Sequence, residues 1–218
     1  MSLKALNYPS VLAFVVFCTT LVCVFAIGGE ITADGLKELT TDAKSLLLLI
    51  SPLLFLIADG IISPDMKACM VFWKTQNVLP GHEAFSKHAH NDPRISVKLL
   101  RQSIGEWPRN SEKQNALWYR LLKKVEQQKG IQHSHRSFLL ARDITCIALF
   151  YLVSTPILIY FLTATFVSAF MAFLSFGFIY FVMAFVAKNL GVRLVKNVLA
   201  ESQPMITEPV EKKSIGFH

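Results

Sequence analysis

Four long apolar runs constrain this chain more than any other feature. They cover about residues 8–27, 45–62, 144–163 and 165–187, and only the second holds a charged side chain, Asp59. About 20 apolar residues in a helix cross the roughly 30 Å hydrocarbon core of a membrane, because each residue rises about 1.5 Å. The pattern predicts an all-α membrane protein with four transmembrane helices.

Charge is separated from these runs. Charged residues make up 17% of the 218 residues, against about 25% in soluble proteins, and most lie between the second and third runs. This separation is expected of a chain divided between lipid and water. Only Ala164 separates the third run from the fourth, so these two are predicted to form an antiparallel hairpin.

The first run also resembles a secretory signal peptide, because Lys4 precedes it and Val24-Phe25-Ala26 ends it. Its apolar core covers the 17 residues from Val11 to Ile27. The core of a signal peptide usually has only about 7–15 residues. We therefore expect an uncleaved transmembrane helix.

The distribution of Lys and Arg predicts the orientation. Of the 22 basic residues, all except Lys37 and Lys44 lie outside the segment 28–44, which joins the first two runs. Basic residues accumulate on the cytoplasmic side of a membrane protein. Both termini and the segment 63–143 are therefore assigned to the cytoplasm. The small size and plain organisation of the chain favour a bacterial inner membrane.

The predicted organisation has four parts. They are an N-terminal transmembrane hairpin at 1–62, a basic cytoplasmic helical region at 63–143, a C-terminal transmembrane hairpin at 144–187, and an amphipathic helix with a mobile tail at 188–218. The second part has too little apolar sequence for a large core of its own. We expect it to form a small helical cap on the membrane helices or on a partner.

Capping patterns predict two helices in this cap. Asp92-Pro93 is typical of a helix start, and Gly105 of its end. Ser111 with Gln114 three residues later is a capping-box pattern. It predicts a second helix that continues to about Lys129, where Gly130 would stop it.

The segment 63–143 has 14 basic and 7 acidic residues. Cytoplasmic topology with attraction to anionic lipid headgroups explains this excess, and an acidic protein partner is the alternative. Nucleic acid is disfavoured, because no phosphate-binding glycine loop or RNA-binding signature is present. The candidate partner-binding or lipid-binding residues are Arg94, Arg120, Lys123, Lys124, Arg193 and Lys196.

Small residues follow one face of the fourth run. Ala164, Ser168 and Ala172 have a four-residue spacing, and small side chains let membrane helices approach closely. This face is predicted to pack either against the third run of the same chain or against another subunit of a homo-oligomer.

Two His-x-His pairs raise the possibility of a metal site. His88, His90, His133 and His135 could together supply the four ligands of a zinc ion. No acidic cluster or CxxC spacing supports such a site, so no metal or other cofactor is expected. No nucleophile–base pattern is present either, and the chain is predicted not to be an enzyme.

Three functions follow from these features. The preferred one is an integral membrane subunit or anchor, expected to be homo-oligomeric, which presents the basic region to a cytoplasmic protein. The alternative is a self-assembling pore or membrane-perturbing effector, for example of a bacterial defence or toxin system. The third is a metal-dependent membrane enzyme. A conventional transporter is disfavoured because Asp59 is the only charged residue inside the four runs.

Overall fold

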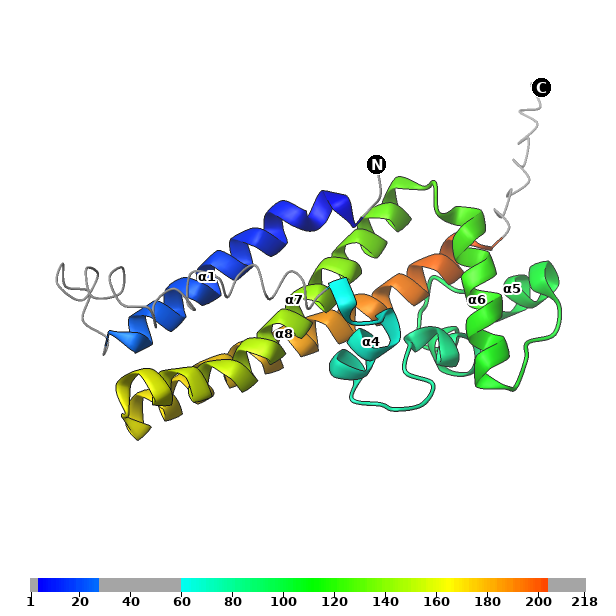
Figure 1. Ribbon diagram of the computed structural model, residues 1–218. Helices are drawn as coiled ribbons and strands as arrows, with labels where there is room; N and C mark the ends of the chain where they lie inside the picture. Colours follow the sequence, from blue (N-terminus) through cyan, green and yellow to red (C-terminus); the bar gives the residue numbers. More distant parts are fainter. Residues whose placement is uncertain (1–3, 28–59, 204–218) are drawn as a thin grey trace, which may run out of the picture.

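The computed structural model describes residues 4–27 and 60–203, and this part of the chain is helical without strands (Figure 1). Three helices in it are long and apolar enough to cross a membrane. They are α1 (Tyr8–Ala26), which a short 3₁₀ turn, η1 (Ala5–Asn7), precedes, α7 (Lys129–Thr163) and α8 (Phe166–Glu201). The all-α fold and three apolar helices are thus confirmed. The second predicted run, 45–62, lies almost wholly outside the described residues, and so does Asp59.

Helices α7 and α8 form a tight antiparallel hairpin. Ala164 adopts a left-handed conformation with a φ of 53°, and its N–H donates to the carbonyl oxygen of Tyr160 at 2.9 Å. Thr165 then leads directly into α8. Both helices continue through the changes in composition at 143 and 187. The 36 residues of α8 therefore extend about 54 Å, well beyond the thickness of a bilayer core. The predicted amphipathic segment, Lys188 to Ala200, is the last part of α8.

A stripe of small and aromatic residues joins the two helices of the hairpin. On α8 the buried stripe recurs every three or four residues and consists of Ala169, Ala172, Phe176, Tyr180, Ala184, Ala187 and Gly191. Ala148 of α7 packs with Tyr180 and Ala184, and Ala141 of α7 packs with Ala187. Small side chains at these positions let the two backbones approach closely over most of their length.

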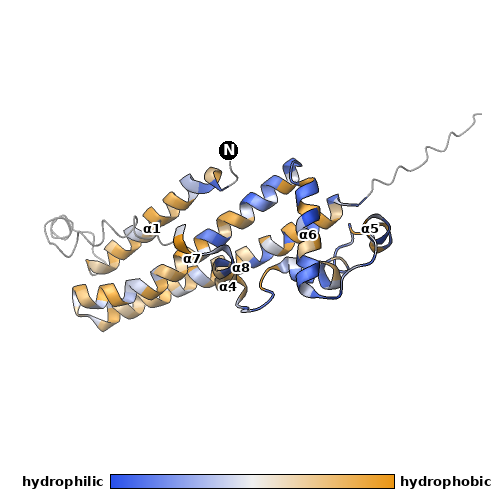
Figure 2. Cartoon of the chain, turned by 45° about the vertical axis from the view of Figure 1, so that its right-hand side comes forward, coloured by the Kyte–Doolittle hydropathy of each residue, from blue (hydrophilic) through white to orange (hydrophobic). Residues whose placement is uncertain are grey.

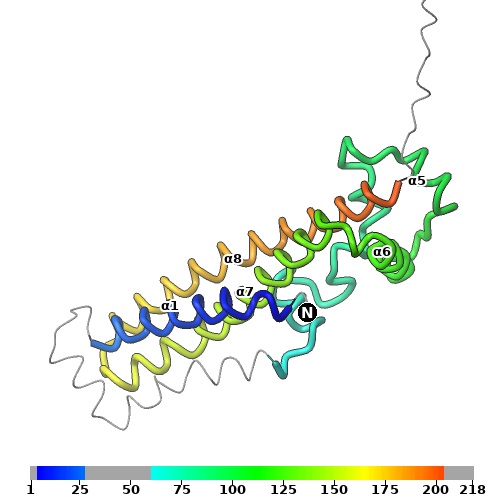
Figure 3. The backbone as a smooth tube through the Cα atoms, turned by 90° about the horizontal axis from the view of Figure 1, so that it is seen from above, coloured from blue at the N-terminus to red at the C-terminus, as the bar shows by residue number. Residues whose placement is uncertain are grey.

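Helix α1 lies beside α7 and runs parallel to it (Figure 3). Asn7 donates to the carbonyl oxygen of Arg136 at 3.0 Å, and further along both helices Thr19 bonds the hydroxyl of Tyr151 at 2.9 Å. The start of α1 is therefore next to the start of α7, and its end points toward the Ala164 turn. Ala172 and Phe176 of α8 belong to the same apolar cluster as the buried residues of α1 and Tyr151 of α7.

The remaining helices pack around the α7 and α8 ends that are distant from this turn. They are α4 (Pro64–Phe72), the short 3₁₀ turn η2 (Pro80–Glu83), the π-helical turn η3 (Ala84–His88), α5 (Val97–Ile104) and α6 (Ser111–Val125). We call residues 64–125 the α4–α6 cluster. Its core joins Phe85, Leu100 and Trp118 to Leu194 and Val198 of α8. Figure 2 shows hydrophilic residues concentrated at this end of the molecule.

The ends of the short helices differ from their predicted positions. Helix α5 begins at Val97 with Ser96 as its N-cap, rather than at Pro93, because the Asp92 carboxylate is held by Arg94 instead of by a helix terminus. Helix α6 ends at Val125, and Gly130 lies in the first turn of α7 rather than at the end of a helix.

The predicted capping box is also wrong. The N-cap of α6 is Asn110, whose side-chain oxygen accepts from the N–H groups of Glu112 and Lys113. The side-chain oxygen of Gln114 accepts instead from the N–H groups of Phe85 and Ser86 at 3.2 and 3.1 Å. A long-range contact to η3 has therefore replaced the local one that the sequence suggests.

Candidate interaction surface

Helix α6 presents a basic face to its surroundings. Arg120, Lys123 and Lys124 are exposed because the opposite face of the helix, with Trp118 and Leu121, is buried in the core. Lys123 pairs with Glu126 at 2.8 Å. Within the described residues no ion pair holds Arg120 or Lys124. Most of the positive charge on this face is therefore available for contact with a partner.

The other predicted basic residues lie near the end of α8. Arg94 pairs with Asp92 at 2.8 Å, and Lys196 donates to the carbonyl oxygen of Asn91 at 2.8 Å. Arg193 is exposed on α8. Lys196 thus fixes the loop 91–96 to α8, whereas the Arg94–Asp92 pair lies within the loop. The six predicted residues come from three elements: Arg120, Lys123 and Lys124 lie on α6, Arg193 and Lys196 on α8, and Arg94 in the loop 91–96.

The loop 91–96 is further closed by the end of the described chain. The side-chain amide of Gln203 donates to the carbonyl oxygen of Arg94 at 3.0 Å, and its oxygen accepts from the N–H of Ser96 at 2.6 Å. The hydrogen bonds from Arg94 lower the pKa of Asp92 to about 2. Asp92 therefore keeps its charge, and its bond to Arg94, throughout the physiological range of pH.

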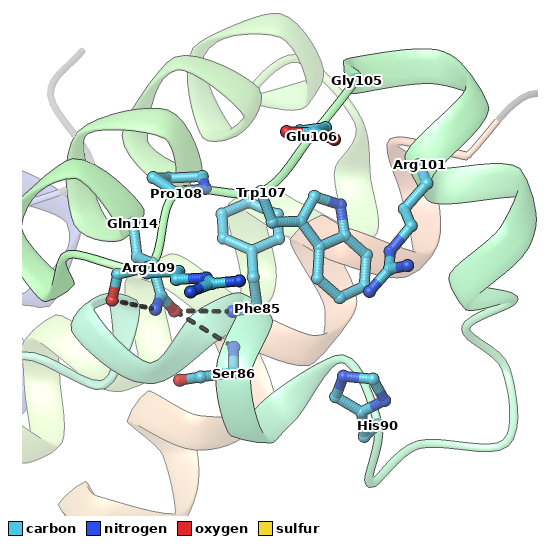
Figure 4. Close-up of a pocket in the computed structure, with 10 residues that line it drawn as sticks. All are labelled: Phe85, Ser86, His90, Arg101, Gly105, Glu106, Trp107, Pro108, Arg109 and Gln114. Atoms are coloured by element: carbon cyan, nitrogen blue, oxygen red, sulfur yellow. Dashed lines mark hydrogen bonds between the residues drawn. The ribbon is translucent and has the colours of Figure 1, made fainter.

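A cavity of about 710 Å³ opens beside Trp107 (Figure 4). The indole ring of Trp107 forms a wall, with Phe85 at 5.5 Å and His90 at 5.6 Å between ring centres. The guanidinium of Arg101 stacks over the indole at 4.8 Å. The rest of the lining comes from Ser86, Gly105, Glu106, Pro108, Arg109 and Gln114. Polar and aromatic groups from four segments thus converge on one hollow.

The histidine pairs do not form a metal site. Among the described residues no group of three or more His, Cys, Asp or Glu side chains is close enough to hold a metal ion. His88 is buried in η3, His90 lies against Trp107, and His133 and His135 lie on α7. Burial lowers the pKa of His88. The four side chains therefore have separate environments, which corrects the zinc hypothesis.

A buried ionic cluster was not predicted from the sequence. The ammonium group of Lys67 on α4 lies 3.3 Å from the carboxylate of Asp143 on α7, and both side chains are less than 5% exposed. The Arg142 guanidinium donates to the same carboxylate oxygen at 3.1 Å. In the sequence Asp143 borders an apolar run like any interfacial carboxylate. Nothing local points to a partner 76 positions away.

Aromatic and basic side chains meet where the apolar part of α8 ends. The indole N–H of Trp73 donates to the hydroxyl of Tyr180 at 2.8 Å, and that hydroxyl donates to the carbonyl oxygen of Met70. The ammonium group of Lys188 lies 3.0 Å from the centre of the Trp73 ring. Trp, Tyr and Lys are enriched at the membrane–water interface, because their apolar bodies and polar ends suit that boundary.

The predicted small-residue face is only partly correct. Ala172 is fully buried, but Ser168 is half-buried, and Ala164 is exposed in the turn before α8 begins. A constant four-residue spacing drifts around a helix with 3.6 residues per turn. The buried positions follow the mixed three- and four-residue spacing instead, and they face α7 and α1 of the same chain.

Comparisons with protein-family models, curated proteins and solved structures found no match for this chain. Its function is therefore inferred from its own residues and geometry.

Proposed function

We propose that this protein is an integral membrane anchor that presents the basic face of α6 to an acidic cytoplasmic protein. It would cross a bacterial inner membrane four times, with both termini and the α4–α6 cluster in the cytoplasm. Anionic lipid headgroups would bind near Lys188 and Trp73. The stripe on α8 is used within the chain, so self-association would occur through other, lipid-facing residues.

The path of the chain supports a fourth crossing. Helix α1 runs parallel to α7, so Ala26 lies toward the Ala164 turn. Helix α4 packs beside Asp143 and Cys146, near the opposite end of the apolar part of α7. This arrangement supports a return across the bilayer between Ala26 and Pro64. The apolar run at 45–62 is long enough to do so.

The observation that carries the proposed function is the free basic face of α6. Its apolar face completes the core of the cluster, while Arg120 and Lys124 are exposed and form no ion pair or side-chain hydrogen bond within the described residues. Exposed charges that no internal pair neutralises raise the rate of association with an oppositely charged partner. This face lies on a helix that α8 supports, so its side chains have a rigid base.

The test is a quantitative pull-down of the full-length protein, tagged at its C-terminus, at native expression after mild detergent extraction. The variant changes Arg120, Lys123 and Lys124 to Gln. The matched control changes Lys74, Lys87 and Lys98 to Gln, and so removes the same charge elsewhere on the cluster. Loss of a stoichiometric cytoplasmic partner from the α6 variant alone is the expected result.

Equal recovery of the partner by both variants would refute the role of α6. A large complex that contains only this chain would favour the pore alternative. Point substitutions are preferable to deletion of 92–129, because the deletion would remove Leu100, Trp118 and Leu121 from the core. Loss of binding would then report unfolding rather than recognition.

A further inference from the structure

The cavity beside Trp107 is not used by the proposed anchoring role. Its volume of about 710 Å³ lies within the roughly 300–1,000 Å³ range of small-molecule sites. Residues from η3 and the turn after it, from α5, from α6 and from the loop between the last two helices line it (Figure 4). Gln114 fixes the relative position of two of these elements, because its side chain bonds Phe85 and Ser86 of η3 from within α6.

Two arginines, Arg101 and Arg109, supply the positive charge of this cavity. Arg101 is stacked on Trp107, and no ion pair or side-chain hydrogen bond occupies its guanidinium within the described residues. The same holds for the guanidinium of Arg109. A guanidinium stacked on an aromatic ring keeps its N–H donors in a fixed plane, where they can bind two oxygens of an anion together. The stacking therefore orients the guanidinium of Arg101 for such a ligand.

The other polar groups of the cavity are compatible with an anion. Ser86 is exposed and offers a hydroxyl donor, and the imidazole of His90 is exposed at the edge of the Trp107 ring. Glu106 is the carboxylate of the lining, but it pairs with neither arginine in the described residues. The lining therefore has more free donors than free acceptors.

We propose that this cavity binds a phosphate-bearing ligand whose oxygens are held by Arg101 and Arg109. Two guanidinium groups and a hydroxyl offer more donors than a single carboxylate accepts, whereas a terminal phosphate has three oxygens that accept strongly. The volume leaves room for the rest of a small molecule against Trp107. The phosphate could belong to a soluble metabolite or to a lipid headgroup, and both present the same group to the arginines.

The first experiment titrates inorganic pyrophosphate into the full-length protein, in nanodiscs of phosphatidylcholine, by calorimetry. The variant changes both Arg101 and Arg109 to Gln, and the control changes Lys113 and Lys129 to Gln. Loss of the charge-assisted hydrogen bonds should weaken pyrophosphate binding by at least about tenfold in the arginine variant. The control, with the same net charge, should bind as the wild type does.

Arg109→Gln alone guards against misfolding, because Arg101 packs on Trp107 whereas the side chain of Arg109 is exposed. This single variant should also bind pyrophosphate more weakly while its thermal unfolding midpoint stays unchanged. Absence of pyrophosphate binding to the wild type would overturn the proposal unless the lipid experiment below shows binding at these arginines. Equal weakening by the control variant would overturn it outright.

The second experiment distinguishes the two sources of phosphate. Native mass spectrometry would compare how much phosphatidylglycerol the wild type and the arginine variant retain from mixed nanodiscs. Lower retention by the variant assigns the cavity to a lipid headgroup, and equal retention with arginine-dependent pyrophosphate binding assigns it to a soluble ligand. If the arginine variant retains both ligands as the wild type does, the proposal is wrong. The pull-down uses α6 residues outside the cavity, so the two proposals fail separately.

Discussion

Gly81 occupies a position where α6 leaves no room for a side chain. A Cβ atom there would overlap the side-chain oxygen of Asn115 and lie 2.9 Å from the ring of Trp118. The Trp118 ring is buried in the core of the cluster, so it cannot move away freely. The same close approach explains why η2 can pack directly on α6. At the scale of single residues, the α4–α6 cluster thus depends on side-chain sizes and protonation states.

We expect Gly81→Ala to reduce the free energy of unfolding by about 1–3 kcal/mol, the usual cost of overpacking. Gly130→Ala is the matched control, because nothing lies within 4 Å of its added methyl group. Thermal unfolding in detergent, followed by tryptophan fluorescence, measures both. A Gly81→Ala midpoint no lower than that of the control would contradict the close contact between η2 and α6.

His88 should make the stability of the cluster depend on pH. Burial lowers its folded pKa below the ordinary value of 6.5, the charges of Lys87, Lys196 and Lys74 lower it further, and Glu83 opposes them. Between 6.5 and the folded pKa, the unfolded chain binds a proton that the folded chain does not. Stability should therefore fall as the pH drops through this window, and change little from this group above it.

His88→Gln removes the titrating group at this position. The unfolding midpoint of the wild type should decline more steeply than that of the variant as the pH falls below 6.5. Parallel declines of the two proteins over that interval would show that His88 does not carry the effect. The comparison needs one detergent and one ionic strength throughout.

At the scale of elements, helix starts were harder to predict than helix existence. Helices α5 and α6 are both present where amphipathic patterns indicate them. Their first residues depend on which of several neighbouring polar side chains turns back to cap the backbone. Asp92 is instead bound by the nearby Arg94, and Gln114 by the distant η3. Ser96 and Asn110 therefore form the N-caps.

Asn110→Ala should reduce the free energy of unfolding by about 0.5–2 kcal/mol, because two N–H groups at the start of α6 lose their acceptor. Ser111→Ala should have little effect, since Ser111 is already inside the helix. Chemical unfolding followed by tryptophan fluorescence compares the two directly. If Ser111→Ala proves the more damaging substitution, the capping box that the sequence suggests is the correct arrangement.

At the scale of the whole molecule, one ionic cluster joins the α4–α6 cluster to the membrane helices. Lys67 brings α4 against Asp143, and Arg142 supplies a second positive group to that carboxylate. Charges removed from water are costly unless their partners remain in place. The contact therefore favours one position of α4 on α7, beside the packing of Val71 with Ala141 and Ala187.

Asp143→Asn should lower the free energy of unfolding by about 3–5 kcal/mol, because it leaves buried positive charge without this carboxylate. Glu126→Gln tests an exposed pair, that with Lys123, and should cost less than about 1 kcal/mol. Thermal unfolding measures the difference, and limited proteolysis between α4 and α5 reports release of the cluster. Similar small effects of both substitutions would show that the buried pair does not hold α4.

Much of the architecture could be predicted from the sequence for a simple physical reason. A bilayer demands uninterrupted apolar helices of a known length, and residues 144–187 could meet that demand only as two helices with a turn near Ala164. The excess of Lys and Arg outside 28–44 likewise favours one orientation. These signals are local and additive, so they can be recognised in the sequence without knowledge of any tertiary contact.

The basic residues of α6 could be predicted, but the cavity beside Trp107 and the buried ionic cluster could not, because they depend on contacts between residues that are distant in the sequence. Lys67 meets Asp143, Gln114 meets Phe85, and Phe85 meets Trp107 only after the helices have packed. Spacing alone suggested instead the capping box at Ser111 and a zinc site at the histidine pairs. Hydrophobic periodicity determines which face of a helix is buried, but tertiary structure decides which polar groups share the remaining space.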